Sequence, residues 1–318
     1  MRYILSLLAG VTFLSHSAEV YRTENSVVNA NAYIEYSVMT GHDPTESPYI
    51  SDSKDRDILG VSGVYVYDIN TAFLGSVMRD TTKDKWEHHF AGVNISDTNT
   101  SWTVLYGKQP SIYDVQAGKG DYSYKLGGVT VGGELGGGIT DNTIRSTLVE
   151  NRLAFGVSHS FGYKSIDNIT AFAARYAFDD VTVSIGYLSG LSFTKKGYDN
   201  IDIDRKYKLS STAYQTGIAY TKDKLSLGAS IEKANIGRWN VLSYEVGVRY
   251  FVSDKMSFAS TYGNRDATFK KTQSDISTNQ ITFGTGYKVH PNAELYAEVR
   301  QDFYGRYSAS AIGTKIYF

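Results

Sequence analysis

The stretch L-S-Y-E-V-G-V-R-Y-F-V, from Leu242 to Val252, decides the fold class because apolar and polar side chains alternate along it. Every second residue is apolar, and the positions between them, apart from Phe251, carry small or charged side chains, including Glu245 and Arg249. A period of two is typical of a β-strand whose two faces meet different environments. The stretch therefore predicts a strand with hydrocarbon on one face and water on the other.

The same alternation recurs from about residue 29 onward, and no helical period interrupts it. Near the start, Ile34, Tyr36 and Val38 alternate with Glu35 and Ser37. We expect sixteen strands, an even number that would place both ends of the barrel domain on one side of a membrane. Their predicted ranges are 29–38, 57–67, 70–80, 86–95, 100–108, 143–149, 152–162, 168–178, 180–189, 210–221, 223–235, 240–252, 255–265, 276–288, 292–303 and 307–318.

The connections between these strands alternate in length. Tight turns fall at 67–70, 178–181, 221–224, 252–255 and 289–292, and longer polar or glycine-rich segments lie near 40–56, 109–142, 190–210 and 265–275. A soluble β-sandwich or a propeller would also show alternating strands. Short turns at one end facing longer loops at the other instead favour an outer-membrane barrel. The prediction is an all-β, transmembrane, antiparallel β-barrel with sixteen strands.

The first eighteen residues read as a secretory signal peptide. Arg2 precedes an apolar run from Tyr3 to Leu14, and small residues follow it. Cleavage after Ala18 or after Ser17 would leave residues 19–318 as one barrel domain. At the other end, the last strand finishes in Phe318, which we expect to act as an assembly signal for the barrel.

Composition excludes several classes of protein. The chain has no cysteine, so it can form neither a disulfide nor a cysteine metal site. Its net charge of −1 offers no general attraction for nucleic acid. Apart from the N-terminal segment, no apolar run approaches the roughly 18 residues that a spanning helix needs. We expect no metal and no cofactor.

Three motifs carry a family resemblance. They are Y-E-V-G-V-R-Y-F-V-S-D-K-M-S at 244–257, A-E-V-Y at 18–21, and L-Y-G-K-Q at 105–109 followed by Tyr113-Asp114-Val115. In these motifs the chain resembles the general diffusion porins of Gram-negative bacteria. The resemblance implies an integral outer-membrane protein that forms a water-filled channel for passive diffusion of ions and small hydrophilic solutes. It also implies a homotrimer, contact with membrane lipid and lipopolysaccharide, and insertion by the barrel-assembly machinery.

The resemblance further implies that the third external loop, from Gln109 to Asn142, folds into the lumen and narrows it. In this family, acidic groups on that loop face basic groups on the barrel wall. Position by position, the basic wall residues correspond to Lys108, Arg145 and Arg56, and the acidic loop residues to Glu134, Asp141 and Asp114. Lys108 shares its alternation with the apolar Trp102 and Tyr106, so it would point inward only at a β-bulge.

Alternation alone predicts which other charged residues line the lumen. A charge facing lipid costs about 2–4 kcal/mol at the bilayer midplane, so charges on the polar face of a strand should meet water. The residues that follow this rule are Glu35, Arg175, Glu232, Glu245, Arg249, Glu298, Arg300 and Lys315.

Other functions remain to be weighed against the channel. A substrate-specific channel, a non-conducting adhesin and a membrane enzyme could all use a barrel. The neighbours His88 and His89 must point to opposite faces of one strand, so they cannot share a metal or form a dyad. No set of serine, histidine and acid stands out as catalytic. The sequence therefore predicts a protein that is not an enzyme.

Overall fold

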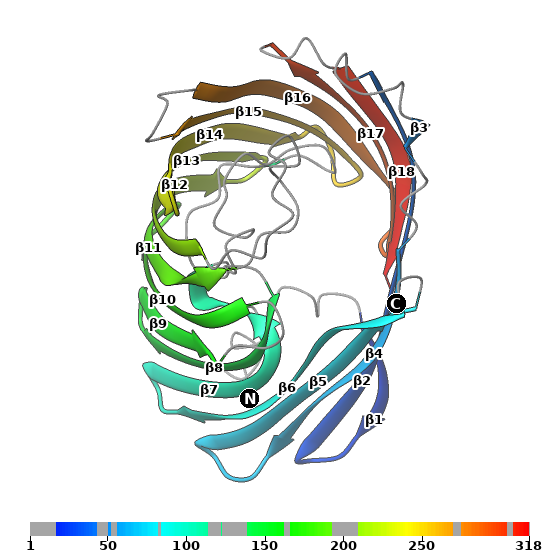
Figure 1. The fold of residues 1–318 in the computed structure, drawn as a ribbon. Coiled ribbons are helices and arrows are strands. Elements are labelled where there is room, and N and C mark those ends of the chain that lie inside the picture. Colours follow the sequence, from blue (N-terminus) through cyan, green and yellow to red (C-terminus); the bar gives the residue numbers. More distant parts are fainter. Residues whose placement is uncertain are drawn as a thin grey trace.

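A computed structural model describes residues 17–42, 50–51, 56–81, 84–113, 122, 139–161, 166–192, 209–269, 275–303 and 308–317. Sixteen antiparallel strands form a closed ring, in which each strand pairs with the next and the last pairs with the first (Figure 1). In ring order they are Ser26–His42 (β2), Arg56–Val66 (β4), Thr71–Asp80 (β5), Lys85–Ser96 (β6), Thr100–Pro110 (β7), Ile139–Glu150 (β8), Leu153–Ser160 (β9), Ile166–Phe178 (β10), Val181–Ser192 (β11), Leu209–Lys222 (β12), Leu225–Ile236 (β13), Trp239–Phe251 (β14), Met256–Phe269 (β15), Asp275–His290 (β16), Ala293–Asp302 (β17) and Ser308–Tyr317 (β18).

The ring closes on β2, which holds both ends of the barrel domain. One edge of β2 pairs with β4, and the other pairs with β18 as far as Tyr33, opposite Tyr317. Two residues further along that edge, Asn31 pairs with Ser17, the first residue of a short strand Ser17–Arg22 (β1). β1 therefore continues the line of β18 along β2. A two-residue strand, Ile50–Ser51 (β3), also pairs with β2.

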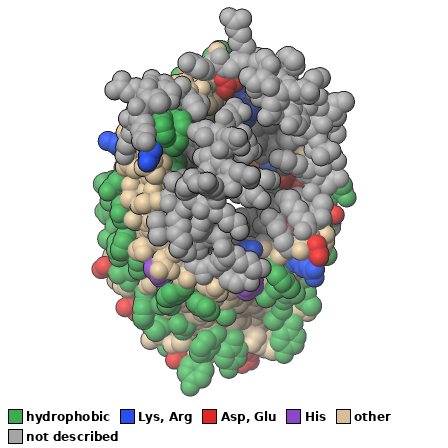
Figure 2. Space-filling view, in the orientation of Figure 1, with side chains coloured by type: hydrophobic (Ala, Val, Ile, Leu, Met, Phe, Trp, Pro, Cys, Tyr) green, Lys and Arg blue, Asp and Glu red, His purple; other side chains and the backbone are tan. Residues whose placement is uncertain are grey.

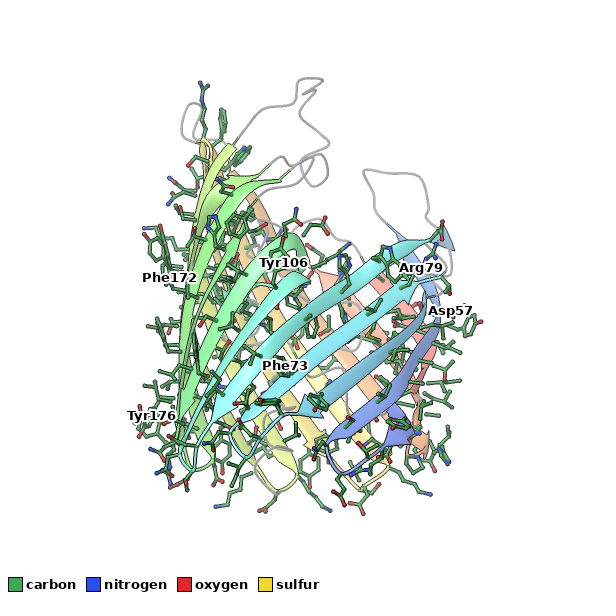
Figure 3. All side chains as sticks on the ribbon, turned by 90° about the horizontal axis from the view of Figure 1, so that it is seen from below. Asp57, Phe73, Arg79, Tyr106, Phe172 and Tyr176 are labelled. Carbon is green, nitrogen blue, oxygen red and sulfur yellow. The ribbon has the colours of Figure 1, made fainter. Side chains whose placement is uncertain are left out.

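The two faces of the wall differ as the alternation predicts. Large apolar side chains such as Phe73, Tyr106, Phe172 and Tyr176 stand on the outside of the barrel (Figure 3). Hydrophobic side chains also dominate the visible outer wall in Figure 2. The buried inward positions are instead rich in serine, threonine, glutamine and glutamate. This division matches a wall between lipid and water. No helix in the described part of the chain is long and apolar enough to cross a membrane.

Short turns gather at one end of the barrel, which we assign to the periplasm. Two-residue turns there use Asn151, Asp179 and Asp223 at positive φ, a conformation that Asn and Asp tolerate better than most residues. Two others share the sequence D-x-N-T. In each, an aspartate Oδ1, from Asp68 or Asp97, accepts the backbone N–H groups two and three residues on. These hydrogen bonds lower the pKa of both aspartates. The stabilisation of the two turns by the charged carboxylates is therefore present at neutral pH and is lost as the pH falls through the lowered pKa.

The structure confirms sixteen strands and places all five predicted tight turns at the same end. It also corrects several boundaries. The first barrel strand runs over Ser26–His42 rather than 29–38, and the sixth over Ile139–Glu150 rather than 143–149. The sequence analysis missed β1 and β3. Residues 1–16, which contain most of the expected signal peptide, and Phe318 lie outside the described residues.

Glycines on the inner face let neighbouring strands approach closely. A Cβ added to Gly92 would overlap the carbonyl oxygen of Val104 and lie 2.5 Å from Cδ2 of Leu105 on β7. Gly107, on the same pair of strands, has a φ of 140°, which strains any other residue. β8 has a bulge opposite this point. Gly107 pairs with Thr143 and Gln109 pairs with Thr140, so two steps along β7 match three steps along β8.

Candidate functional site: the lumen and the segment after β7

The segment that follows β7 lies against the inner wall of the barrel. The backbone N–H of Ile112 donates to Oγ of Ser158 on β9, at 3.0 Å. The hydroxyl of Tyr113 donates to Oε2 of Glu232 on β13, at 2.7 Å. Both loop side chains are almost fully buried and belong to an apolar cluster with inward residues of β10–β15. The start of this connection is thus held inside the ring.

Tyr122 fixes the same connection at a second place. Its backbone N–H donates to Oγ1 of Thr261 on β15, at 2.9 Å, and its hydroxyl donates to the carbonyl of Leu227 on β13, at 3.2 Å. Arg249 on β14 donates from Nη2 to the Tyr122 carbonyl, at 2.8 Å, and its guanidinium lies 5.9 Å from the ring centroid. The described residues of this connection therefore attach to the wall from β9 to β15.

Acidic and basic groups meet tyrosines where the ring closes. Glu35 on β2 is 5 % exposed and accepts the Tyr33 hydroxyl at 2.7 Å and the Tyr296 hydroxyl at 3.0 Å. Lys315 on β18 holds its ammonium 4.9 Å from the centroid of the Tyr296 ring. The register places Lys315 directly opposite Glu35. These partners offset the cost of holding a carboxylate out of bulk water.

The predicted constriction residues that the structure describes lie where β7 and β8 join this segment. Nζ of Lys108 is 3.7 Å from Oδ1 of Asp141. The bulge at this point supplies the extra residue on β8, so Asp141 and Asn142 together oppose Lys108. Arg145 is 7 % exposed and donates from Nη1 to the carbonyl of Pro110, at 3.0 Å. Arg145 therefore supports the beginning of the segment.

Other predicted constriction residues are not placed. Asp114 and Glu134 lie outside the described residues, and only the backbone of Arg56 is described, at the start of β4. Their roles remain predictions.

The remaining predicted lining residues sit on inward positions of three strands. Arg175 is on β10 and is exposed; Glu245 and Arg249 are on β14; Glu298 and Arg300 are on β17. In the ladder, Arg249 and Glu298 occupy one row, separated by Ala259 and a glycine. Tyr122 packs against the cluster that contains Ala259, so the small residues of this row make room for the loop.

Sequence reasoning missed the residues that hold the segment after β7. Tyr113 stood within the family motif at 113–115, but the motif carried no sign that its hydroxyl reaches Glu232, which lies 119 positions along the chain. Tyr122 and Thr261 gave no signal at all, since a tyrosine in a glycine-rich loop and a threonine on a polar face are both ordinary. No group of acids and histidines suited to a metal occurs among the residues described.

A closed barrel with an apolar outside, a polar and charged inside and one connection held against its inner wall defines an outer-membrane channel protein. The model of the Gram-negative porin family matches residues 85–306. The chain therefore belongs to the Gram-negative porin family and is an integral protein of the outer membrane. As a member of that family it forms an outer-membrane channel for small solutes. None of the curated protein sequences matches this chain.

Solved structures share the fold at low sequence identity. OmpT of Vibrio cholerae, described in its trimer form, is 17% identical, with a TM-score of 0.77 over 93% of this chain and 100% of that one. OmpF of Salmonella typhi, in complex with daunomycin, is 13% identical, with a TM-score of 0.74 over 94% and 100%. An anion-selective porin from Comamonas acidovorans is 12% identical, with a TM-score of 0.65 over 92% and 100%.

Proposed function

We propose that the channel carries ions and small hydrophilic solutes by passive diffusion and that the segment after β7 sets its narrowest part. The observation that carries this proposal is the attachment of Tyr113 and Tyr122 to Glu232, Thr261 and Arg249 on the inner wall. A connection held there occupies part of the cross-section and leaves the rest to water. A sixteen-stranded barrel is wide enough to keep an aqueous path beside it.

The charges of the narrow part form the second element of the proposal. Basic Lys108, Arg145 and Arg56 would face acidic Glu134, Asp141 and Asp114. Opposite charges across a pore impose a transverse field that orders water and disfavours apolar solutes. The contact of Arg145 with Pro110 supports its place beside the loop. The 3.7 Å approach of Lys108 to Asp141 would neutralise part of the field.

We propose that the protein catalyses no reaction. The described structure does contain one contact between a serine and a histidine, Oγ of Ser76 at 3.0 Å from Nε2 of His88. Both side chains are buried, at 4% and 5% exposure, so a substrate in the lumen could not reach the serine. His89, the neighbour, is exposed on the other face of β6. A nucleophile must be accessible to the atom it attacks, which argues against a catalytic dyad here.

The proposed assembly is a homotrimer of processed chains. Outward residues of the early and late strands are large and apolar, for example Leu59, Val61, Phe73, Val299 and Ile312. Such a face suits burial against a second copy. The connection between β5 and β6, within residues 80–86, is short, so contacts between walls would carry most of the interface. Removal of residues 1–18, contact with lipopolysaccharide and lipid, and insertion by the assembly machinery belong to the same proposal.

The test is single-channel recording in a planar bilayer, with the reversal potential measured under a salt gradient. We expect large stepwise openings, in groups of three for a trimer. A protein that is folded and heat-modifiable on a gel but does not conduct would contradict the proposal and favour a plugged barrel. Saturation of the current by one sugar at low concentration would instead favour a substrate-specific channel.

Arg249 and Arg175 allow a sharper prediction about the lumen. Each Arg→Gln substitution removes one positive charge from an inward position, so both should shift the reversal potential toward cation preference. Only Arg249 contacts Tyr122, so only Arg249→Gln should also raise the noise of the open channel. Equal noise in the two variants would show that Tyr122 does not depend on Arg249.

A further inference from the structure

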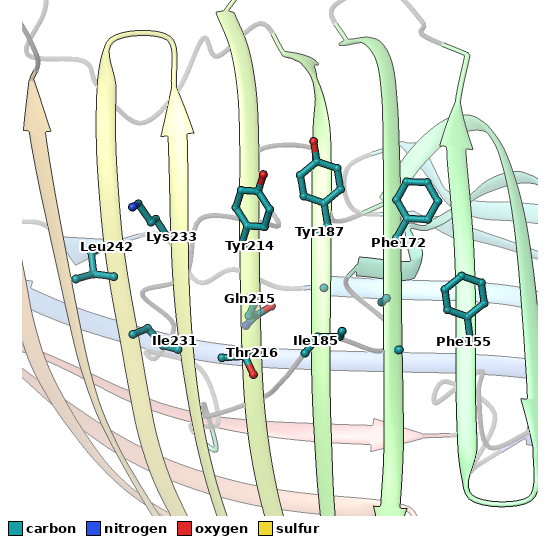
Figure 4. A pocket seen from close by; sticks show the side chains of 13 residues that line it. Phe155, Phe172, Ile185, Tyr187, Tyr214, Gln215, Thr216, Ile231, Lys233 and Leu242 are labelled. Atoms are coloured by element: carbon teal, nitrogen blue, oxygen red, sulfur yellow. The ribbon is translucent and has the colours of Figure 1, made fainter.

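The pairing of β18 with β2 closes the barrel, and no turn joins these two strands. In a hairpin, the turn fixes the register of the strands that it connects. In Figure 4, for example, Phe172 on β10 faces Tyr187 on β11, two strands that the turn at Asp179 and Asp180 joins. β2 and β18 come from opposite ends of the barrel domain, so the side chains of the two strands must set their register.

The outward side chains of this seam do not select one register. They are Ile34 and Tyr36 on β2 and Ile312, Thr314 and Ile316 on β18. Because side chains alternate with a period of two, a shift by two residues keeps the same faces outward and inward. Contacts among apolar outward groups are non-directional and survive such a shift. The inward side chains therefore have to distinguish the native register from its neighbours.

Glu35 joins the strands of the seam on the inward side. Its side chain accepts the Tyr33 hydroxyl, from β2 itself, at 2.7 Å and the Tyr296 hydroxyl, from β17, at 3.0 Å. In the β18–β2 ladder, Lys315 lies directly opposite Glu35. The Lys315 ammonium is 4.9 Å from the centroid of the Tyr296 ring, so it lies on the same inward surface. With 5 % exposure, Glu35 depends on these groups rather than on water.

The Tyr296 hydroxyl reaches Glu35 because β18 has a glycine between them. Tyr296 pairs with Gly313, and a Cβ on Gly313 would lie 2.5 Å from Oη and 2.6 Å from Cζ of Tyr296. The hydroxyl end of the ring therefore occupies the space that a side chain at position 313 would fill. This contact holds β17, β18 and β2 in one alignment.

A shift of β18 by two residues removes the opposition of charges at this point. In one direction Lys315 would face Ser37, and in the other it would face Tyr33, both of which are uncharged. Arg56, which pairs with Glu35 on β4, would stay with Glu35 in either shift and so does not select between them. Opposite charges directly across a strand pair are favourable, so their loss disfavours both shifted registers.

The hydrogen bond from Tyr296 distinguishes the two shifts further. The shift that brings Lys315 to Ser37 carries Glu35 about 7 Å further from the Tyr296 hydroxyl, at roughly 3.3 Å per residue. That register loses both contacts of Glu35. The opposite shift places Glu35 across from Gly313, close to the same hydroxyl, and loses only the lysine.

We propose that Glu35 is the residue that sets the register in which β18 closes the barrel on β2. It does so by facing Lys315 and by accepting the Tyr296 hydroxyl across Gly313. Buried polar contacts can select one arrangement among several that bury similar apolar area, at little gain in stability. The role belongs to barrel closure, and it holds whatever solute the channel carries.

Disulfide cross-linking across the seam reports the register, because the chain has no cysteine of its own. Thr314→Cys combined with Tyr36→Cys reports the native register. Combined with Val38→Cys it reports the shift that brings Lys315 to Ser37, and combined with Ile34→Cys it reports the opposite shift. Only residues directly opposite each other bring their Cα atoms within the range of a disulfide, about 4.4–6.8 Å. After oxidation in isolated outer membranes, links within one chain and links between chains differ in migration on a non-reducing gel.

In the otherwise unsubstituted chain, we expect the native pair to give nearly all of the product linked within one chain. Glu35→Ala should raise both shifted products relative to the native one by about tenfold, the factor for one hydrogen bond to a charged group. Tyr296→Phe keeps the ring on Gly313 and removes only the hydroxyl, so it should raise chiefly the product of the Val38 pair. Glu294→Ala is the matched control. It removes a carboxylate that lies opposite Lys315 on β17, and it should leave every product unchanged.

The proposal is wrong if folded, heat-modifiable Glu35→Ala and Tyr296→Phe give only the native product. It is also wrong if Glu294→Ala raises the shifted products as much as Glu35→Ala does. Should Glu35→Ala not fold, Tyr296→Phe alone decides, since the loss of one hydroxyl leaves the packing of the seam in place. The readout is a cross-link and not a conductance, so a failure here is distinct from a failure of the diffusion channel.

Discussion

The Gly92→Val substitution is expected to block assembly of the barrel. Gly92 faces Leu105 across β6 and β7, and a Cβ at that position would overlap the Val104 carbonyl oxygen. The obstacle is backbone that itself pairs with the next strand, so it cannot move aside as a side chain would. Overpacking of this kind costs about 3 kcal/mol or more, the upper part of its usual range.

The measurement is the fraction of refolded protein that migrates as the heat-modifiable form on a gel, followed by denaturant unfolding of any folded material. Gly75→Val is the control, because a Cβ at Gly75 would meet only the carbonyl oxygen of Phe90, at 3.8 Å. We expect the control to fold like the unsubstituted protein. If both variants folded equally well, β6 and β7 would have to lie further apart than the structure shows.

The second large effect is expected from Tyr113→Phe, which removes a single hydroxyl. That hydroxyl donates to Glu232, which is 1 % exposed. A buried carboxylate that loses a donor is destabilised by about 1–3 kcal/mol. The segment after β7 should therefore leave the wall more often, by about tenfold for each 1.4 kcal/mol. Single-channel recordings should show more frequent brief closures and a noisier open state.

Two comparisons isolate the hydrogen bond. Tyr106→Phe removes a hydroxyl from an exposed tyrosine on the outer wall, and it should leave the recordings unchanged. Glu232→Gln keeps an acceptor for Tyr113, so its effect should be smaller than that of Tyr113→Phe. Unchanged closures in Tyr113→Phe would mean that the other anchors, at Ile112 and Tyr122, suffice to hold the segment.

The fold could be predicted because the barrel depends on a local signal. In a strand such as 242–252, the alternation of side chains shows which face is inside and which is outside. Tight turns such as 178–181 show where strands end. The boundaries were less accurate where polar and apolar faces blur, as at residues 26–28 of β2. β1 was missed because a six-residue strand that overlaps the end of the expected signal peptide has too few alternations to stand out.

The interior was harder to predict because its contacts join distant parts of the chain. Alternation identified Glu232 and Arg249 as inward residues, because it shows which face of its own strand each residue occupies. It does not show which distant residues they contact. That Tyr113 and Tyr122 would meet them depends on how a loop crosses the lumen, and no local pattern encodes that path. Lys108 illustrates the intermediate case. The sequence indicated that Lys108 would point inward only at a bulge. The structure has a bulge here, but its extra residue lies on β8, opposite Lys108, so the alternation of β7 itself is unchanged.

The edge of β2 that faces β18 and β1 is fully paired only when both ends of the barrel domain are present. β18 covers the β2 edge as far as Tyr33, and β1 covers it from Asn31 in the full chain, or from Asn29, opposite Glu19, once residues 1–18 are removed. A chain truncated at either side of this seam would leave part of β2 with unpaired N–H and C=O groups, the kind of edge that recruits other strands and leads to aggregation. Because β2 pairs with both ends of the barrel domain, loss of either end would expose the same strand edge.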